Sequence, residues 1–398
     1  MRPHHRFQRA RTFLLLLCGA FGLTRAAVAQ NVQYGPFRLN FGLGVSAEYR
    51  DNANTSEHDP KSDVTLTAGP NVTGGIFLPF AGGEEFTLTM SASYTHSLFH
   101  VQPDSFGAPL TATLTLPMYI ADWTVLLSDS FSFTNDPLED TFAFNQSNVK
   151  QYSNTAAASA TRQLGKTAFT FAAQRYDTWF PDEPNQEQTD YQFSFTPSLT
   201  LREGYSVFVR NSYGLVYVND PTLQDSTGYS VDAGVNGQIT PSLFGTISLG
   251  WSHSDLSASG TNHAQHFDGV DSNVTLSYTH PLRPNTTHSL SFFRSPGVTL
   301  LLENSSITEV TGLSYTISHR LNRYLTLSPN VSWSHLRSLA GSQTLETADI
   351  IQVGFGLQRQ FTKHFSTALS YFHQIRDSNL PNASYTVNDV TVSANYAF

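Results

Sequence analysis

The chain has 398 residues, of which only 13% are charged while 13% are aromatic. A soluble domain normally carries about 25% charged residues, so this composition argues against an ordinary water-exposed globule. The 26 glycines and 19 prolines are close to average usage, which excludes collagen-like and low-complexity chains. The formal net charge of −9 disfavours nucleic acid as a partner, because an acidic protein repels a polyanion.

The first 29 residues have the pattern of a secretory signal peptide. Arginines at positions 2, 6, 9 and 11 precede the apolar run 13–17, and Ala27-Val28-Ala29 forms a small-x-small cleavage site. A membrane anchor is the alternative, but the apolar run is shorter than the roughly 20 residues of a spanning helix. We expect residues 1–29 to be removed together with Cys18, the one cysteine, and residues 30–36 to form a short periplasmic segment.

From Phe37 onward, apolar residues recur at every second position. Between Phe37 and Tyr49 the odd positions are apolar and the even positions are small or polar, which places the apolar set on one face of a β-strand. The same alternation returns over residues 86–94, 123–127, 205–209, 243–251 and 365–371. No window after Gln30 approaches 18 consecutive apolar residues, so helical membrane spans are not expected.

Short and long connections alternate along the chain. Eight short turns are predicted near residues 81–84, 117–122, 163–166, 202–204, 240–242, 281–286, 320–323 and 361–364. Nine longer polar loops are predicted near residues 51–61, 99–108, 134–147, 177–189, 218–227, 254–266, 295–305, 336–346 and 377–384. This alternation predicts an all-β fold over residues 37–398, a transmembrane antiparallel up-and-down β-barrel of about 18 strands with short periplasmic turns and longer extracellular loops. A soluble β-sandwich is the alternative, but sandwiches do not require strictly alternating loop lengths.

Aromatic residues near the strand ends predict two girdles at the membrane interfaces, where the ring lies in lipid and the polar atom at headgroup level. Those assigned to the long-loop side are Tyr49, Tyr94, Tyr176, Trp179, Tyr213, Tyr217, Trp251, Tyr278, Trp333, Tyr371 and Tyr385. Those assigned to the short-turn side are Trp123, Tyr205, Phe244, Tyr324 and Phe365. Arg337 has outward parity above Trp333, so we expect it to meet a phosphate of lipopolysaccharide.

The final strand has the pattern of an assembly signal. Apolar residues alternate from Val390 to Phe398, and the aromatic pair Tyr396 and Phe398 resembles the signal that bacterial outer-membrane barrels present to the barrel assembly machinery. Pairing of this strand with Phe37–Tyr49 would close the sheet, since an open edge in lipid leaves backbone groups unsatisfied. The chain is therefore expected in the bacterial outer membrane, with lipid and lipopolysaccharide around it.

Strand parity also predicts which residues face the lumen. The charged candidates are Arg50, Arg210, Arg376, Glu48, Asp63 and Asp190. Opposed charges across a constriction would orient polar solutes by a transverse field, whereas mutual neutralisation near the rim is the alternative. The same parity directs Val64, Leu66, Phe193, Phe195, Val207, Val209, Val390 and Val392 toward lipid, and Thr65, Gln192 and Thr391 toward the lumen.

A segment around the first long loop resembles a known family. Tyr49-Arg50-Asp51-Asn52, followed by Lys61-Ser62-Asp63 and Gly69-Pro70, is similar to the first hairpin of a β-barrel porin family found beside exopolysaccharide and exosortase-type systems. This resemblance implies an outer-membrane channel or an export-associated barrel. It supplies no functional residues to carry over.

Candidate residues for catalysis at the rim occur without a motif. His253 with Ser252 and Asp255, or His335 with Ser334, provides the residue types of a hydrolase, but no G-x-S-x-G turn marks a nucleophile. We expect no enzyme activity.

His263 and His266 could bind a metal, but they lack further ligands at suitable spacing. Neither a metal nor any other cofactor is expected. The favoured function is a channel that passes small polar solutes or assists polysaccharide export. A structural or adhesive barrel without an open pore is the first alternative, and a rim enzyme is the second. The sequence leaves the oligomeric state open.

Overall fold

A computed structural model of the chain describes residues 32–78, 84–102, 104–134, 150–181, 187–219, 224–258, 263–301, 304–341 and 346–398. Within these ranges, no helix is long and apolar enough to cross a membrane. The predicted signal peptide over residues 1–29 lies outside the described residues, as does most of the predicted loop over residues 134–147.

The described residues form nineteen β-strands. Their bounds are β1 (Val32–Tyr34), β2 (Phe37–Arg50), β3 (Asp63–Leu78), β4 (Glu84–Ser97), β5 (Ser105–Ile120), β6 (Trp123–Thr134), β7 (Gln151–Leu164), β8 (Thr167–Trp179), β9 (Gln188–Arg202), β10 (Tyr205–Val218), β11 (Ser226–Thr240), β12 (Leu243–Leu256), β13 (Gln265–Thr279), β14 (Thr286–Leu301), β15 (Asn304–Asn322), β16 (Leu325–Gly341), β17 (Thr347–Gln360), β18 (Phe365–Ser378) and β19 (Tyr385–Ala397).

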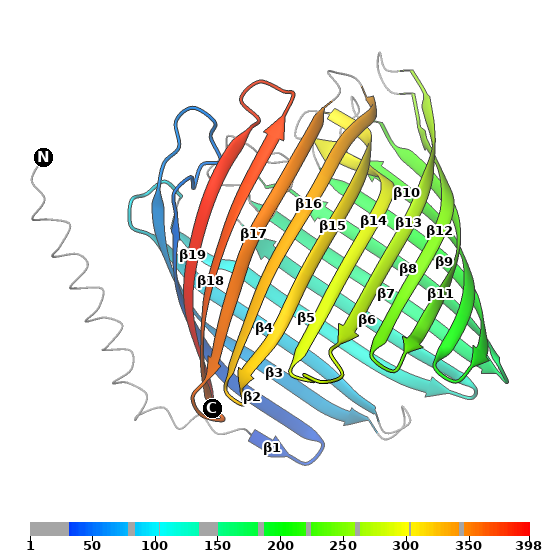
Figure 1. Ribbon diagram of the computed structural model, residues 1–398, viewed down its shortest axis with the longest axis horizontal. Coiled ribbons are helices and arrows are strands. Elements are labelled where there is room, and N and C mark those ends of the chain that lie inside the picture. Colours follow the sequence, from blue (N-terminus) through cyan, green and yellow to red (C-terminus); the bar gives the residue numbers. More distant parts are fainter. Residues whose placement is uncertain are drawn as a thin grey trace, which may run out of the picture.

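Strands β2 to β19 form a closed antiparallel barrel of 18 strands (Figure 1). Each strand pairs with its neighbours in sequence, and β19 pairs with β2 through partners such as Tyr396 and Leu43. Closure satisfies the backbone groups of both edge strands, which lipid could not do. The predicted barrel, its antiparallel order and its strand number are confirmed. The short strand β1 adds a hairpin to the lower end of β2.

The short turns lie at one end of the barrel and the long connections at the other (Figure 1). Gly165 and Gly204 occupy two of the short turns with φ values of 62° and 72°, a left-handed conformation in which a side chain would be strained. The long loop predicted over residues 295–305 is wrong, because β14 and β15 continue pairing from Ser295 with Val310 to Leu301 with Asn304. A hairpin that satisfies its own backbone hydrogen bonds can extend beyond the membrane without needing a loop.

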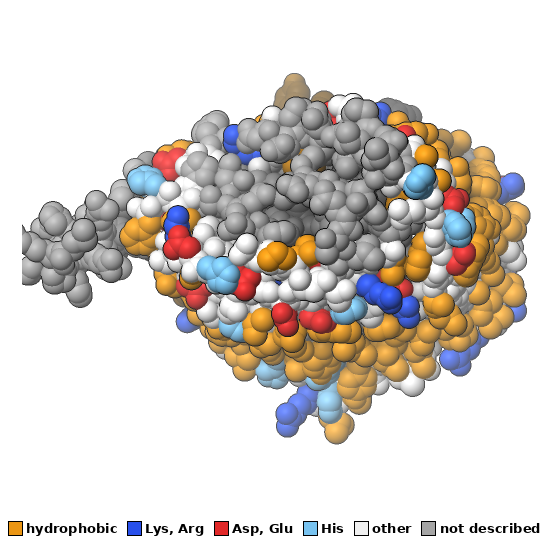
Figure 2. All heavy atoms as spheres, turned by 90° about the horizontal axis from the view of Figure 1, so that it is seen from above, with side chains coloured by type: hydrophobic (Ala, Val, Ile, Leu, Met, Phe, Trp, Pro, Cys, Tyr) orange, Lys and Arg blue, Asp and Glu red, His pale blue; other side chains and the backbone are white. Residues whose placement is uncertain are grey.

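Apolar side chains cover the outer wall, while charged and histidine side chains gather at the upper rim (Figure 2). Phe193 and Val392 are about half exposed on this wall, and Tyr49 pairs with Val64 on the same face. Cross-strand partners share a face, so the register carries the outward set around the whole barrel. Taken over the whole barrel, the opposite face carries mainly serine, threonine, asparagine, glutamine and glycine, while the inward face of β2 also carries Arg38, Glu48 and Arg50.

Four of the predicted girdle positions are wrong. Tyr278 lies at the short-turn end, because β13 runs from a long connection toward a short turn and ends at Thr279. Tyr176 pairs with the inward-facing Asp190, and Tyr385 is buried beside Arg376 on the inward face of the wall. Phe244 pairs with Gln238 on the inward side of β11. The positions of aromatic residues near strand ends do not determine which way a strand runs or which face a side chain occupies. The register of strand pairing determines both.

Candidate functional site: the lumen wall and its rim

The inward face of β10 and β11 carries an ion pair that is open to the lumen. Arg210 donates from Nε to Asp232 Oδ2 at 3.0 Å and from Nη2 to Asp232 Oδ1 at 2.8 Å. The two residues are direct cross-strand partners, so the fork of the guanidinium meets both carboxylate oxygens. The Arg210 side chain is 44% exposed while that of Asp232 is 4% exposed. The arginine therefore presents its edge to the lumen, with its charge balanced from within the wall.

Further carboxylates lie on neighbouring strands of the same wall. Asp232 and Asp271 are both paired in register with Gly250, so they lie on either side of a residue without a side chain. A Cβ at Gly250 would approach the Cβ of Asp232 to 2.4 Å, which shows that the glycine makes room for this carboxylate. Asp190 accepts a hydrogen bond from Gln192 at 3.3 Å. These residues line or adjoin a polar hollow of about 380 Å³ on the inner wall.

Hydroxyl groups line the wall over strands β3 to β8. Five pairs of inward hydroxyls bond across neighbouring strands from β3 to β8, at 2.7–3.2 Å. The pairs are Thr67 with Thr95, Ser91 with Thr111, Thr113 with Ser130, Ser132 with Ser153, and Thr161 with Thr170. We call these five pairs the hydroxyl ladder. A hydroxyl both donates and accepts, so this wall offers polar contacts without a net charge.

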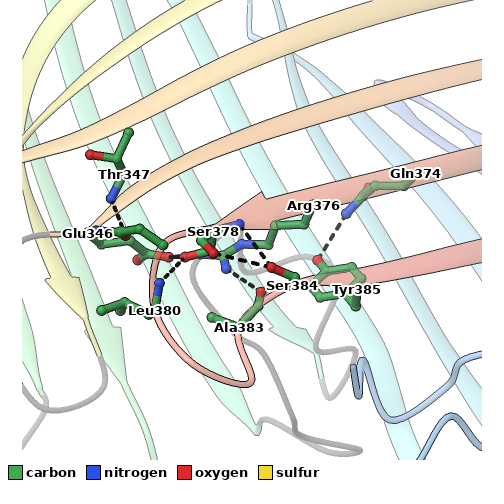
Figure 3. A network of polar contacts seen from close by, with 10 residues as sticks. Glu346, Thr347, Gln374, Arg376, Ser378, Leu380, Ala383, Ser384 and Tyr385 are labelled. Carbon is green, nitrogen blue, oxygen red and sulfur yellow. Dashed lines mark hydrogen bonds and ion pairs between the residues drawn. The ribbon is translucent and has the colours of Figure 1, made fainter. Parts of the chain in front are cut away.

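Near the rim, Arg376 forms the centre of a buried polar network (Figure 3). Its Nη2 donates to Glu346 Oε1 at 2.6 Å and its Nη1 donates to the Ala383 carbonyl at 2.6 Å. The Ser378 hydroxyl donates to the same Glu346 oxygen at 2.6 Å. The side chains of Arg376 and Glu346 are 0% and 3% exposed, respectively. This arginine joins the β16–β17 connection to the β18–β19 connection and does not face open lumen.

Arg50 has a similar place at the seam of the barrel. Its Nε lies 3.2 Å from Asp389 Oδ2 on β19, and its Nη2 lies 2.7 Å from Glu48 Oε1 on the same strand. Arg50 is 5% exposed and Asp389 is 2% exposed. The contact crosses the closing pair of strands, so it ties the two ends of the chain together near the rim.

Asp63 holds the connection that follows β4. Its carboxylate accepts hydrogen bonds from the backbone N–H groups of Val64, Phe99 and Gln102 at 2.7–3.1 Å, and from the Ser97 hydroxyl. The nearby carboxylate of Asp104 accepts from the Ser97 N–H at 2.9 Å and contacts His96 Nδ1 at 2.8 Å. These two hydrogen bonds hold the pKa of Asp104 below its ordinary value. Both aspartates anchor the connection between β4 and β5.

The register therefore divides the charged candidates into two groups. Glu48, Arg50, Asp63 and Arg376 lie in rim networks, whereas Asp190 and Arg210 lie on the polar wall. Of the two alternatives, the contacts of the arginines agree with mutual neutralisation, because each arginine is bonded to a carboxylate beside it in the wall. The free-energy cost of burying an arginine is lower when a carboxylate beside it neutralises the charge than when its nearest partner lies on the far side of the lumen.

The residues Asp232, Asp271 and Glu346 were absent from the sequence prediction. Inward parity was a usable signal for Asp232 and Asp271, because each lies on a strand whose alternation is clear. Glu346 lies in a connection, where alternation gives no information.

The rim histidines do not form catalytic groups with the serines beside them. His253 contacts Asp268 at 2.9 Å and Asp255 at 3.1 Å on the outward face, while Ser252, one residue away on β12, faces inward. His335 contacts Asp349 at 3.0 Å in the same outward position. Among the described residues, no group of three histidines, cysteines or acids could hold a metal ion.

The predicted assembly residues lie at the seam. The Phe398 N–H donates to the Phe41 carbonyl at 2.9 Å, and its ring lies 5.1 Å from the ring of Tyr396. Tyr396 pairs with Leu43 on the outward face, beside Phe365. Both aromatic residues therefore lie at the short-turn end, where β19 closes the barrel.

Comparison with one solved structure supports the architecture, and two further structures give lower scores. A BenF-like porin from Pseudomonas fluorescens Pf-5 superposes with a TM-score of 0.50 at 8% identity, over 90% of this chain and 99% of that one. OccAB3 from Acinetobacter baumannii gives a TM-score of 0.48 at 12% identity, and opdK from Pseudomonas aeruginosa gives 0.48 at 10%, each over 90% of this chain and 99% of the other. At these identities the likeness concerns the fold alone. No curated protein matches the sequence.

A family model places the chain more specifically. The model described as Putative beta-barrel porin 2 matches residues 128–398, which is more than half of the chain. The matched range does not include the first hairpin, residues 49–70, on which the resemblance in the sequence rested. The family match therefore rests on different residues of the chain. The closed barrel with its apolar outer wall and the family match agree on an outer-membrane location. The chain belongs to the Putative beta-barrel porin 2 family, as an outer-membrane, porin-like barrel.

Proposed function

We propose that the barrel is an outer-membrane channel for small, uncharged polar solutes. The observation that carries this proposal is the chemistry of the inward face, where hydroxyl and amide side chains predominate and the inward arginines of β2, β10 and β18 are paired with carboxylates within the wall. Barrels of 16–18 strands are wide enough to leave an aqueous interior. A wall of this kind offers water and neutral solutes hydrogen bonds of similar strength.

The hydroxyl ladder supports passage rather than tight binding. Each of its hydroxyls already has a partner on the neighbouring strand, so a solute exchanges one modest hydrogen bond for another. Such an exchange is worth about 0.5–1.5 kcal/mol per bond. Conduction requires sites that are weak enough to leave, and this wall meets that requirement.

The charged groups support weak discrimination between ions. Arg38, Arg50, Arg210 and Arg376 each form an ion pair with a carboxylate. Asp190 and Asp271 add further acidic groups on the polar wall. The proposal therefore includes a small preference for cations over anions.

The proposal extends to how the barrel reaches the membrane. Residues 1–29 would direct secretion and be removed, and residues 37–398 would be inserted by the barrel assembly machinery. Arg337, which is paired in register with Glu309 on the outward face, would meet lipopolysaccharide phosphate. Assistance to polysaccharide export, which the family resemblance implies, would use the same hydroxyl-lined lumen.

Reconstitution into planar bilayers and liposomes tests the channel. We expect ionic conductance with a small, cation-directed reversal potential in a salt gradient, and faster liposome swelling in a neutral sugar than in a sugar acid of equal size. A folded barrel that conducts no ions and admits no sugar would leave the structural or adhesive role. A strongly anion-selective conductance would contradict the assignment of the polar wall.

Two matched variants connect the selectivity to the wall. Arg210→Gln leaves Asp232 without its cation, so we expect the reversal potential to move closer to the value of a cation-selective channel. Asp232→Asn leaves Arg210 without its anion, so we expect a shift in the opposite direction. Identical reversal potentials in the two variants would show that this pair does not face the permeation path.

A further inference from the structure

The outward face of β7 differs from the rest of the outer wall. Its central outward residues are Ala156, Ala158 and Ala160, whereas β17 carries Ile351, Val353, Phe355 and Leu357 at comparable positions. The large residues Leu127 on β6 and Phe171 on β8 are 37% and 48% exposed on either side of the alanines. Two contiguous hollows of about 570 and 410 Å³ result, and both are lined by Ala158, Ala173 and Phe193.

Small residues between large ones change the shape of a barrel. The outer surface of a barrel is convex, so a second barrel would normally contact it along one strand only. The small side chains of β7 between the larger side chains of β6 and β8 reduce this convexity, so that several strands can take part in a contact. Small residues let backbones approach closely in lipid, where packing and polar contacts drive association.

Ionisable residues lie on the same face. Asp129 on β6 and Arg175 on β8 are both paired in register with Ala156, so they lie on either side of it. Asp129 accepts from Asn154 Nδ2 at 3.3 Å, and Arg175 donates from Nη2 to Asp177 Oδ1 at 2.9 Å. Ionisable side chains directed at lipid are costly and are normally found where they meet protein or water.

We propose that this face binds a second copy of the chain around a twofold axis that crosses β7 at Ala156. Such an axis, parallel to the membrane normal, places β7 against β7 of the other copy and β6 against β8. Asp129 of each copy then faces Arg175 of the other, so the surface is self-complementary. One guanidinium has five N–H donors, so Arg175 can donate to Asp177 of its own chain and to Asp129 of the other copy at the same time.

The heights of the two charged residues are compatible with this pairing. Two strand spacings of about 4.8 Å at a tilt of about 40° offset Asp129 and Arg175 by about 6 Å along the membrane normal. The flexible stem of an arginine can span this offset. The alanines at the axis leave no side chain that would hold the two β7 strands apart.

Cysteine crosslinking tests the interface. In a Cys18→Ser background, Ala156→Cys places one thiol at the axis, where only a twofold contact brings it next to its own copy. We expect oxidation in outer membranes to give a dimer of this variant. Val353→Cys, which is 49% exposed on β17, is the matched control and should stay monomeric. Equal crosslinking at the two positions would overturn the proposal.

A charge variant tests the pairing itself. Adding Asp129→Leu to Ala156→Cys should lower the dimer fraction at least fivefold while the heat-modifiable barrel remains. If that variant assembles poorly, Asp129→Asn keeps the shape and should give the same loss. An unchanged dimer fraction in the assembled variant would refute the ion pairing. Native mass spectrometry that finds only monomers, with lipid bound or without it, would overturn the dimer.

Discussion

Removing one partner of the buried rim pair should be far more costly than removing one partner of an exposed pair. Arg376 and Glu346 have side chains that are 0% and 3% exposed, whereas the side chains of Arg38 and Glu85 at the opposite end are 55% and 34% exposed. Arg376→Met leaves the Glu346 carboxylate buried with the Ser378 hydroxyl but without its cation. Breaking a buried pair in this way costs about 3–5 kcal/mol. Arg38→Met should cost about 1 kcal/mol or less.

Urea unfolding of the barrel in lipid vesicles measures both free energies. The double variant Arg376→Met with Glu346→Leu provides the control, because removing both charges removes the desolvation cost together with the attraction. Replacing a buried pair by apolar residues is often neutral, so the double variant should recover most of the loss. Equal free energies of unfolding for Arg376→Met and Arg38→Met, or a double variant as unstable as the single one, would refute this reasoning.

Three further predictions concern assembly, topology and the rim. Phe398→Leu should give less heat-modifiable barrel than Phe398→Trp, because an aromatic ring beside Tyr396 favours the membrane interface. Equal assembly of the two variants would show that the assembly machinery does not recognise the aromatic ring. Cysteine at Thr391 should react with a water-soluble reagent and cysteine at Val392 should not, and the reverse labelling would overturn the register. The pKa of Asp104 lies below its ordinary value of 3.8, so its contribution is present above that pH and is lost as the pH falls further. Proteolysis of the connection between β4 and β5 should therefore be unchanged at pH 5 and rise only well below pH 4, and enhanced cleavage already at pH 5 would contradict this.

The fold was largely predictable because a barrel is specified by local patterns. Alternation over Phe37–Tyr49 gives a strand and its outward face, and the change of connection length gives strand direction. Local patterns fail where a strand continues beyond the membrane, as β14 and β15 do, because backbone pairing there no longer requires an apolar face. They also misplace Tyr278, since an aromatic residue near a strand end is compatible with either interface.

The ion pairs were less predictable than the strands. Parity places Arg210 and Asp232 on the inward face, but only the register shows that they are direct partners across β10 and β11. Arg50 meets Asp389, which lies 339 positions away, because the barrel closes between β19 and β2. Arg376 meets Glu346, which lies in a connection and has no strand parity. Partner choice depends on strand stagger, and alternation within one strand carries no information about it.

In the proposed channel, pairing within the wall also determines what a charged residue does to a passing solute. A lone arginine would act at a distance through its net charge, whereas Arg210 bonded to Asp232 acts mainly as a dipole, whose field falls more steeply with distance. Salt screens what remains over a Debye length of about 8 Å under physiological conditions. A solute near the barrel axis therefore senses mostly water and the hydroxyl wall, and only a solute that approaches β10 and β11 meets the guanidinium edge. The same arginine can thus orient a polar molecule at the wall while leaving ion passage along the axis almost unselective.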